Sequence, residues 1–305
     1  MASVEVPPTI APPTGRQFGP QEVPRRRTRR ARRGRAGTSV ANVVGVLFTI
    51  LISFPAYWMI NTAFKPPNEV LTFTPHFWPD NPTFVNFVSA IKAPLFLNVL
   101  RNSVLITVSA VLAALVVGFL GALAVARFRF YGRRALIMVV LLVQTVPFLA
   151  LLIPLFIMLN AAQLTNTLPG VMLVYIVLVL PYTVWTLRGF IANVPKELDE
   201  AALVDGCSRW QTFTKVILPL TAPGLVATSI YSFIQAWNEF IVINTLNAQE
   251  NQNLMAWLLN NQTQRQTFWG PLMAGALITS IPVVVFFLII QKNIAAGLTA
   301  GAVKG

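Results

Sequence analysis

A polar segment in the second half of the chain reads NVPKELDEAALVDGCSRWQTFTKVILP, residues 193–219. Its third residue, a proline, suits the first turn of a helix, and the acidic residues that follow complement the positive end of the helix dipole. Gly206 is placed to end this helix in a left-handed conformation. Ser208 and Gln211 form a capping box that predicts a second helix, which should end before Pro219. The segment is therefore predicted to be a helix, a glycine turn and a second short helix.

Long apolar runs surround the 193–219 segment. Of the 305 residues, 55% are hydrophobic and only 11% are charged, whereas soluble domains are about 25% charged. This composition excludes an ordinary soluble enzyme. A membrane-crossing helix needs about 20 apolar residues, and six runs qualify: residues 40–63, 98–126, 135–160, 168–187, 224–245 and 271–291. Prolines within these runs are tolerated in membrane helices and predict kinks. We predict an all-α integral membrane protein with six transmembrane helices.

The basic residues indicate the orientation of these helices. With the N-terminus in the cytoplasm, 19 of the 23 Lys and Arg residues lie on the cytoplasmic side, as the positive-inside rule requires. Both termini are therefore predicted to be cytoplasmic. Residues 1–37 form an Arg- and Pro-rich tail, predicted to be disordered and held near anionic lipid. A nucleic-acid-binding arm is the alternative for this tail, but the concentration of charge in one short stretch favours membrane lipid over nucleic acid. Residues 292–305 are predicted to be a cytoplasmic C-terminal tail.

The residue types needed for catalysis or metal binding are scarce. Cys207 and His76 are the one cysteine and the one histidine, so neither a disulfide nor a Cys/His metal site can form within the chain. The sequence contains no Gly-x-x-x-x-Gly-Lys-Ser/Thr phosphate-binding loop. We therefore predict no catalytic residue, no metal and no cofactor in this chain. The four acidic residues of the 193–219 segment favour a protein partner there, because anionic lipid would repel them.

The 193–219 segment resembles the coupling loop of binding-protein-dependent ABC importer permeases. The resemblance rests on Glu200-Ala201-Ala202, Gly206 and Val216-Ile217-Leu218-Pro219, with Val216 where Ile is usual and Cys207 where Ala is common. Three further stretches resemble the carbohydrate branch of that family, the maltose- and trehalose-type permeases. They are Ala124-Val-Ala-Arg127, Trp237-Asn238-Glu239 and the end of the chain from Gly297 to Gly305. The resemblance covers residues 40–305.

This resemblance implies the fold and the partners. Residues 38–291 would form a type I ABC importer permease domain in the bacterial plasma (inner) membrane. A second permease subunit would complete the pore, two copies of a cytoplasmic ATPase would supply ATP and Mg²⁺ chemistry, and an extracytoplasmic sugar-binding protein would deliver the substrate. The resemblance assigns ATPase coupling to Glu200, Ala201, Ala202, Asp205, Gly206, Leu218 and Pro219.

Polar residues within the apolar runs are candidates for the translocation path. They are Gln144, Gln235, Trp237, Asn238 and Glu239. Glu239 is the one acidic residue inside a predicted span, where an ionised side chain costs about 3 kcal/mol or more unless it faces protein or water. Its neighbours Asn238 and Asn244 are placed to donate hydrogen bonds to its carboxyl group. The alternative for this group is hydrogen bonding with the second permease subunit.

The loop after the fifth run is rich in Asn and Gln. In the resembling family this loop reaches the binding protein, which implies contacts from Asn251, Gln252, Asn253, Asn260 and Asn261. A merely solvated loop is the alternative. Taken together, the sequence predicts a non-catalytic permease subunit of an ATP-driven sugar importer. A permease for another small solute and an ion-gradient secondary transporter are the alternatives, although a lone Glu239 without a second carboxylate argues against the latter.

Overall fold

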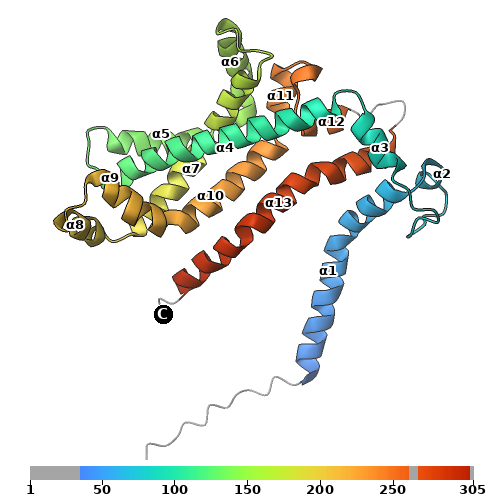
Figure 1. Ribbon diagram of the computed structural model, residues 1–305, viewed down its shortest axis with the longest axis horizontal. Helices are drawn as coiled ribbons and strands as arrows, with labels where there is room; N and C mark the ends of the chain where they lie inside the picture. The colour runs from blue at the N-terminus through green and yellow to red at the C-terminus, as the bar shows by residue number, and fades with distance from the viewer. Residues whose placement is uncertain (1–34, 261–266, 303–305) are drawn as a thin grey trace, which may run out of the picture. The chain divides into compact units, whose positions relative to one another are not determined.

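The computed structural model describes residues 35–260 and 267–302, and it divides into two compact units, residues 1–54 and 55–305. All secondary structure in the described residues is helical, which confirms the predicted all-α class (Figure 1). The predicted N-terminal tail lies outside the described residues, apart from its last three, which begin the first helix. At the other end the last helix continues through most of the predicted C-terminal tail, as far as Ala302.

The elements follow one another in the order that the apolar runs predict, with short helices between the long ones. They are α1 (Arg35–Phe64), α2 (Pro67–Val70), α3 (Val85–Lys92), α4 (Phe96–Arg127), α5 (Arg133–Thr145), α6 (Phe148–Ala161), α7 (Leu168–Asn193), α8 (Lys196–Val204), α9 (Arg209–Thr212), the π-helical turn η1 (Phe213–Ile217), α10 (Leu218–Asn238), α11 (Ile241–Leu246), the 3-10 turn η2 (Gln249–Asn251), α12 (Leu254–Asn260) and α13 (Trp269–Ala302).

Within residues 35–260 and 267–302, five helices are long and apolar enough to cross a membrane. They are Val40–Phe64, Phe96–Arg127, Leu168–Asn193, Arg209–Asn238 and Trp269–Gln291. The third predicted span, residues 135–160, corresponds to α5 and α6, which are bent by 104° relative to each other. All six predicted apolar runs are helical, but the third consists of two helices joined at a sharp bend and is not one straight helix.

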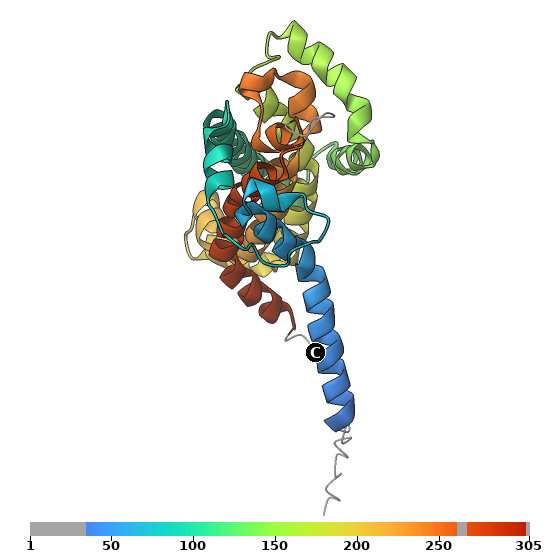
Figure 2. The same ribbon diagram turned by 90° about the vertical axis from the view of Figure 1, so that its right-hand side faces the viewer.

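The bend between α5 and α6 follows from Pro147. Val146, the residue before it, is extended, with φ −75° and ψ 125°, because the proline ring disfavours the helical region for its predecessor. Pro147 also has no N–H with which to continue the hydrogen-bond ladder of α5. Figure 2 shows α6 turning sharply away from α5. The sequence predicted a kink at this proline. The observed bend is larger, because α5 ends at Thr145 and a separate helix, α6, begins at Phe148.

The fifth span departs from the prediction at both ends. Its helix is continuous from Arg209 to Asn238, so the expected end before Pro219 is wrong. The N–H of Leu218 donates to the carbonyl of Phe213, five residues back, and this wider turn lets the helix continue into Pro219. At the far end α10 stops at Asn238 instead of residue 245, and α11 begins after two non-helical residues.

The core of the second unit lies where α4, α7 and α10 pack against one another (Figure 1). Small side chains permit this close approach. A Cβ atom added to Gly118 would lie 2.5 Å from the Thr183 side chain, so α4 and α7 touch through glycine. Thr183 in turn lies within hydrogen-bond distance of Ser232, 3.3 Å between the hydroxyl oxygens, which ties α7 to α10. These three helices form the scaffold on which both polar regions of the chain are built.

Candidate functional site

The 193–219 segment folds as its local sequence signals predict. The helix α8 covers Lys196–Val204, and Gly206 follows it with a φ of +84°. Ser208 then accepts from the N–H of Gln211 at 3.2 Å, while the Gln211 side chain accepts from the N–H of Ser208 at 2.8 Å. This reciprocal capping box starts α9. The prediction of a helix, a glycine turn and a second helix is confirmed; the second helix runs on into α10.

The residues of α8 divide between an exposed and a buried face. Glu200 and Ala201 are exposed, whereas Ala202 is the buried residue of this helix. Because α8 packs against α9 and η1, Ala202 has a packing role within the chain. Asp205 is exposed as the C-cap of α8, and Leu218 and Pro219 lie in the first turn of α10. The predicted coupling residues that are exposed, and so available to another protein, are Glu200, Ala201, Asp205, Gly206 and Pro219.

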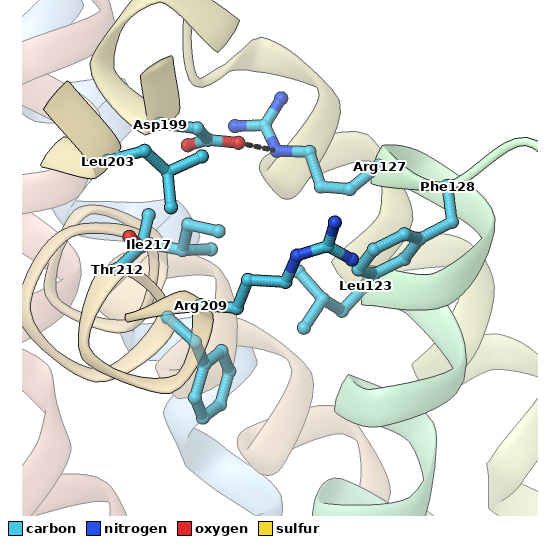
Figure 3. A pocket seen from close by; sticks show the side chains of 9 residues that line it. Leu123, Arg127, Phe128, Asp199, Leu203, Arg209, Thr212 and Ile217 are labelled. Atoms are coloured by element: carbon cyan, nitrogen blue, oxygen red, sulfur yellow. Dashed lines mark ion pairs between the residues drawn. The ribbon is translucent and has the colours of Figure 1, made fainter. Parts of the chain in front are cut away.

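Asp199 fixes α8 to the end of α4. Its Oδ2 lies 2.9 Å from Nε of Arg127, the last residue of α4. The Arg127 Nη2 atom also donates to the carbonyl of Val194 at 2.9 Å. The Arg127 and Asp199 side chains are only 7% and 20% exposed, so water screens the pair weakly. Figure 3 shows Arg127 reaching from α4 to Asp199. One arginine thus holds both α8 and the chain that leads into it.

A cavity of about 250 Å³ lies beside this ion pair. Its wall combines the charged side chains of Arg127, Asp199 and Arg209 with apolar ones from α4 and η1 (Figure 3). Burial raises the pKa of Asp199, and the neighbouring Arg127 guanidinium lowers it by a smaller amount, so that the pKa stays above its ordinary value. Asp199 consequently takes up a proton at a less acidic pH than an exposed aspartate. The ion pair will weaken as the pH falls through that range.

Aromatic contacts complete the attachment of the 193–219 segment. The Phe213 ring of η1 lies edge-on to Phe119 of α4, with 5.5 Å between ring centroids. Trp210 packs on Phe213 at 5.0 Å and is itself 66% exposed. These aromatic side chains dock the start of the second helix on α4. The ion pair of Arg127 with Asp199 was not predicted from the sequence. The available signal was an arginine at the end of one span and an aspartate directly before Glu200.

The candidate path residues do not form one cluster. Trp237 is buried and stacks with Phe233, 5.6 Å between centroids. Gln144 is exposed on α5 and Gln235 on α10, and Asn238, also exposed, donates to the carbonyl of its own helix at Ile234.

Two of the candidate path residues, Gln235 and Asn238, lie with Tyr231 on the exposed face of α10. Tyr231, Gln235 and Asn238 recur at helical spacing, and each is exposed. Tyr182 of α7 packs on Tyr231, with 3.7 Å between ring centroids and the ring planes tilted by 31°. The two tyrosines were missed because their pairing joins separate spans; the repeated polar positions along α10 were the available signal.

Glu239 lies at the break between α10 and α11 and is satisfied within the chain. Its carboxylate accepts from the N–H of Val242 at 3.1 Å, and its Oε2 accepts from the Tyr175 hydroxyl at 3.1 Å. Asn238 and Asn244 do not bond it, so the expected partners are wrong. Tyr175 lies 64 positions away in the sequence, which is why local reading of the sequence did not find it.

The amide-rich segment, residues 247–260, follows α11. Gln252 and Asn253 are 6% and 3% exposed, so these two predicted binding-protein contacts have structural roles inside the chain. Asn251 is partly exposed and donates to the carbonyl of Asn166 at 2.7 Å. Asn260 is exposed and donates to the Asn244 side chain at 2.8 Å. Asn261 lies outside the described residues.

Known proteins share this sequence and this fold. Residues 114–299 match the family described as binding-protein-dependent transport system inner membrane component. That stretch includes Arg127, the whole 193–219 segment, Glu239 and the amide-rich segment. The chain belongs to this family. Membership confirms the resemblance drawn from the Glu200-Ala201-Ala202 loop and makes the chain a multi-pass inner-membrane component of a transport system.

Two relatives in this permease family match nearly the whole chain. The diacetylchitobiose uptake system permease protein DasC of Streptomyces coelicolor is 43% identical over 265 residues, which cover 87% of this chain and 96% of the relative. The trehalose transport system permease protein SugB of Mycobacterium tuberculosis is 38% identical over 266 residues, covering 85% and 96%.

A solved structure shows the same permease fold. It belongs to a bacterial ABC transporter involved in the import of the acidic polysaccharide alginate, and it matches with a TM-score of 0.73 and 20% identity over 85% of this chain and 98% of that one. The fold predicted for the permease domain, that of an ABC importer permease, is confirmed.

Proposed function

We propose that this chain is a membrane-spanning permease subunit of an ATP-driven importer for a small sugar. The observation that carries this proposal is the similarity to two permeases named for diacetylchitobiose and trehalose. They are 43% and 38% identical to this chain over 87% and 85% of its length. Both of these sugars are disaccharides. The chain itself performs no bond chemistry in this account: its reaction is vectorial transport, and a partner ATPase hydrolyses ATP with Mg²⁺.

The exposed face of α8 is the proposed docking surface for that ATPase. Glu200 and Ala201 are exposed there, while Asp199 and Ala202 point into the chain. A carboxylate next to a small side chain lets another protein approach closely and pair with the charge. The positive-inside distribution of Lys and Arg supports a cytoplasmic location for this face and for both termini.

The tyrosine and amide face of α7 and α10 is the proposed wall of the sugar path. Tyr182, Tyr231, Gln235 and Asn238 combine stacking surfaces with hydrogen-bonding groups, which sugars require. Exposed amides on a membrane-crossing helix are costly against lipid, so this face needs either a water-filled path or a second protein. A second permease subunit facing it would enclose the path.

The proposed mechanism is alternating access. When the ATPase subunits close, they move α8, and the contacts of Arg127 with Asp199 and Val194 carry that movement directly into α4. The packing of Phe213, in the turn that leads into α10, on Phe119 of α4 couples the movement of α10 to that of α4. The spans then change from an inward-open to an outward-open arrangement, in which an extracytoplasmic binding protein releases its sugar into the path.

Reconstituted transport tests this proposal. The chain, its partner permease and its ATPase are placed in proteoliposomes, and a binding protein loaded with a radiolabelled disaccharide is added to the side opposite the ATPase. We expect accumulation that requires ATP and survives the collapse of proton and sodium gradients. The control is the same complex with the phosphate-loop lysine of the ATPase replaced by alanine. Uptake that an ion gradient drives without the ATPase would contradict the proposal.

A further inference from the structure

The break between α10 and α11 is held by groups from elsewhere in the chain. In an unbroken helix the carbonyl of Glu239 would accept from an N–H four residues ahead. Here it accepts from Asn253 Nδ2 at 2.6 Å and from the Tyr175 hydroxyl at 3.1 Å. The Glu239 carboxylate in turn accepts a hydrogen bond from the N–H of Val242, at the start of α11. Because the Glu239 carbonyl and the Val242 N–H are both paired, the break is a built feature of the fold.

Asn253 belongs to both the break and the amide-rich segment. Its side-chain oxygen accepts from the N–H of Ala256 at 2.8 Å, which starts α12. Its amide nitrogen bonds Glu239 and lies 3.2 Å from the Tyr175 hydroxyl. The side chain is only 3% exposed, so these bonds do not compete with water. A rotation of α12 must therefore change the geometry at the break or sever its shortest hydrogen bond.

The helix below the break leads directly to the 193–219 segment. Arg209–Asn238 is one continuous span of 30 residues, about 45 Å long at 1.5 Å per residue. One end carries α9 beside α8, and the other end is the Glu239 break. A continuous helix thus joins the proposed ATPase-docking region to the hydrogen bonds of Asn253.

We propose that Asn253 is a positioning residue that transmits binding-protein docking to the coupling helices. Docking on the amide-rich segment shifts α12, Asn253 passes the shift to the Glu239 break, and the Arg209–Asn238 helix carries it to α8 and α9. Tyr175, which is fully buried on α7, is the fixed point against which the break moves. This inference rests on the proposed transport function, since it assigns the route by which a loaded binding protein stimulates ATP hydrolysis.

The test measures ATP hydrolysis by the purified complex, in nanodiscs, with and without its sugar-loaded binding protein. In Asn253→Leu, which keeps the bulk but loses the amide, we expect stimulation by the binding protein to fall about tenfold. Basal hydrolysis and the Kd of the binding protein should stay within about twofold of wild type, because Asn253 is buried within this chain. Tyr175→Phe, which removes one hydroxyl, should reduce stimulation in the same direction.

Asn86→Leu is the matched control. Asn86 is also a buried amide that donates to backbone carbonyls, those of Ala63 and Lys65, but it does not bond the break, so this variant should keep full stimulation. Wild-type stimulation in Asn253→Leu, or an equal loss in Asn86→Leu, would overturn the inference. If Asn253→Leu fails to assemble with its partners, Tyr175→Phe decides, and unchanged stimulation in that variant overturns the inference. A wild-type complex that shows no stimulation at all would instead contradict the proposed function itself.

Discussion

Replacing Ala201 by tryptophan is expected to abolish ATP-driven uptake while leaving the chain in the membrane. Ala201 is exposed on α8 next to Glu200, so the indole does not disturb the core of this chain. It does occupy the space into which the ATPase surface must fit. A misfit at the centre of a protein interface reduces affinity by a factor of about 100 or more. Sugar uptake by cells and co-purification of the ATPase with the tagged permease measure the effect.

Ala162→Trp is the control for this experiment. Ala162 is also exposed but lies between α6 and α7, away from the 193–219 segment, so uptake and co-purification should remain normal. Immunoblots of membrane fractions check that both variants are inserted in equal amounts. Normal uptake together with normal recovery of the ATPase in Ala201→Trp would show that this face of α8 does not bind the ATPase.

Arg127→Met is expected to separate ATP hydrolysis from transport. The methionine keeps the apolar stem, but Asp199 loses its cation and the carbonyl of Val194 loses its donor. Removing one partner of a poorly solvated pair costs about 1–3 kcal/mol, enough to loosen α8 from α4. The ATPase should still bind, because Glu200 and Ala201 remain exposed. We therefore expect hydrolysis to continue while sugar transported per ATP falls about tenfold.

Charge reversal provides the control for the Arg127 prediction. Arg127→Asp and Asp199→Arg each place like charges side by side and should each impair transport strongly. The double variant restores an ion pair of opposite polarity, so transport per ATP should recover part of the loss. A double variant whose loss equals the sum of the single losses would show that the two side chains do not act as a pair.

Local sequence signals determined the 193–219 segment well. Gly206, Ser208 and Gln211 act within a few residues of one another, and the structure places each in its predicted role. The apolar runs likewise predicted the order of the spans, since span length is set by the bilayer. Local signals predicted a helix end before Pro219. They did not predict the π turn just before the proline, which lets the helix continue.

Contacts between distant parts of the chain were not predictable from local patterns. Asp199 pairs with Arg127, the last residue of α4, and Glu239 pairs with Tyr175 of α7. Each pairing depends on how the helices pack against one another. Packing partners have no fixed spacing along the sequence, so a single sequence does not reveal them. The burial of Asn253 was hidden for the same reason: an amide-rich loop resembles a solvated one until its partners on α7 and at the break are known.

Photocrosslinking from position 201 tests the central claim, that this chain is coupled to an ATPase through α8. A photoreactive amino acid replaces Ala201 in one variant and Tyr131 in another; Tyr131 is also fully exposed and, by the charge distribution, on the same side of the membrane. Adducts from transport-active cells are identified by mass spectrometry. We predict that position 201 captures a protein with a Gly-x-x-x-x-Gly-Lys-Ser/Thr loop and that position 131 does not. Adducts from position 201 with lipid alone, in cells that still import sugar, would contradict the account.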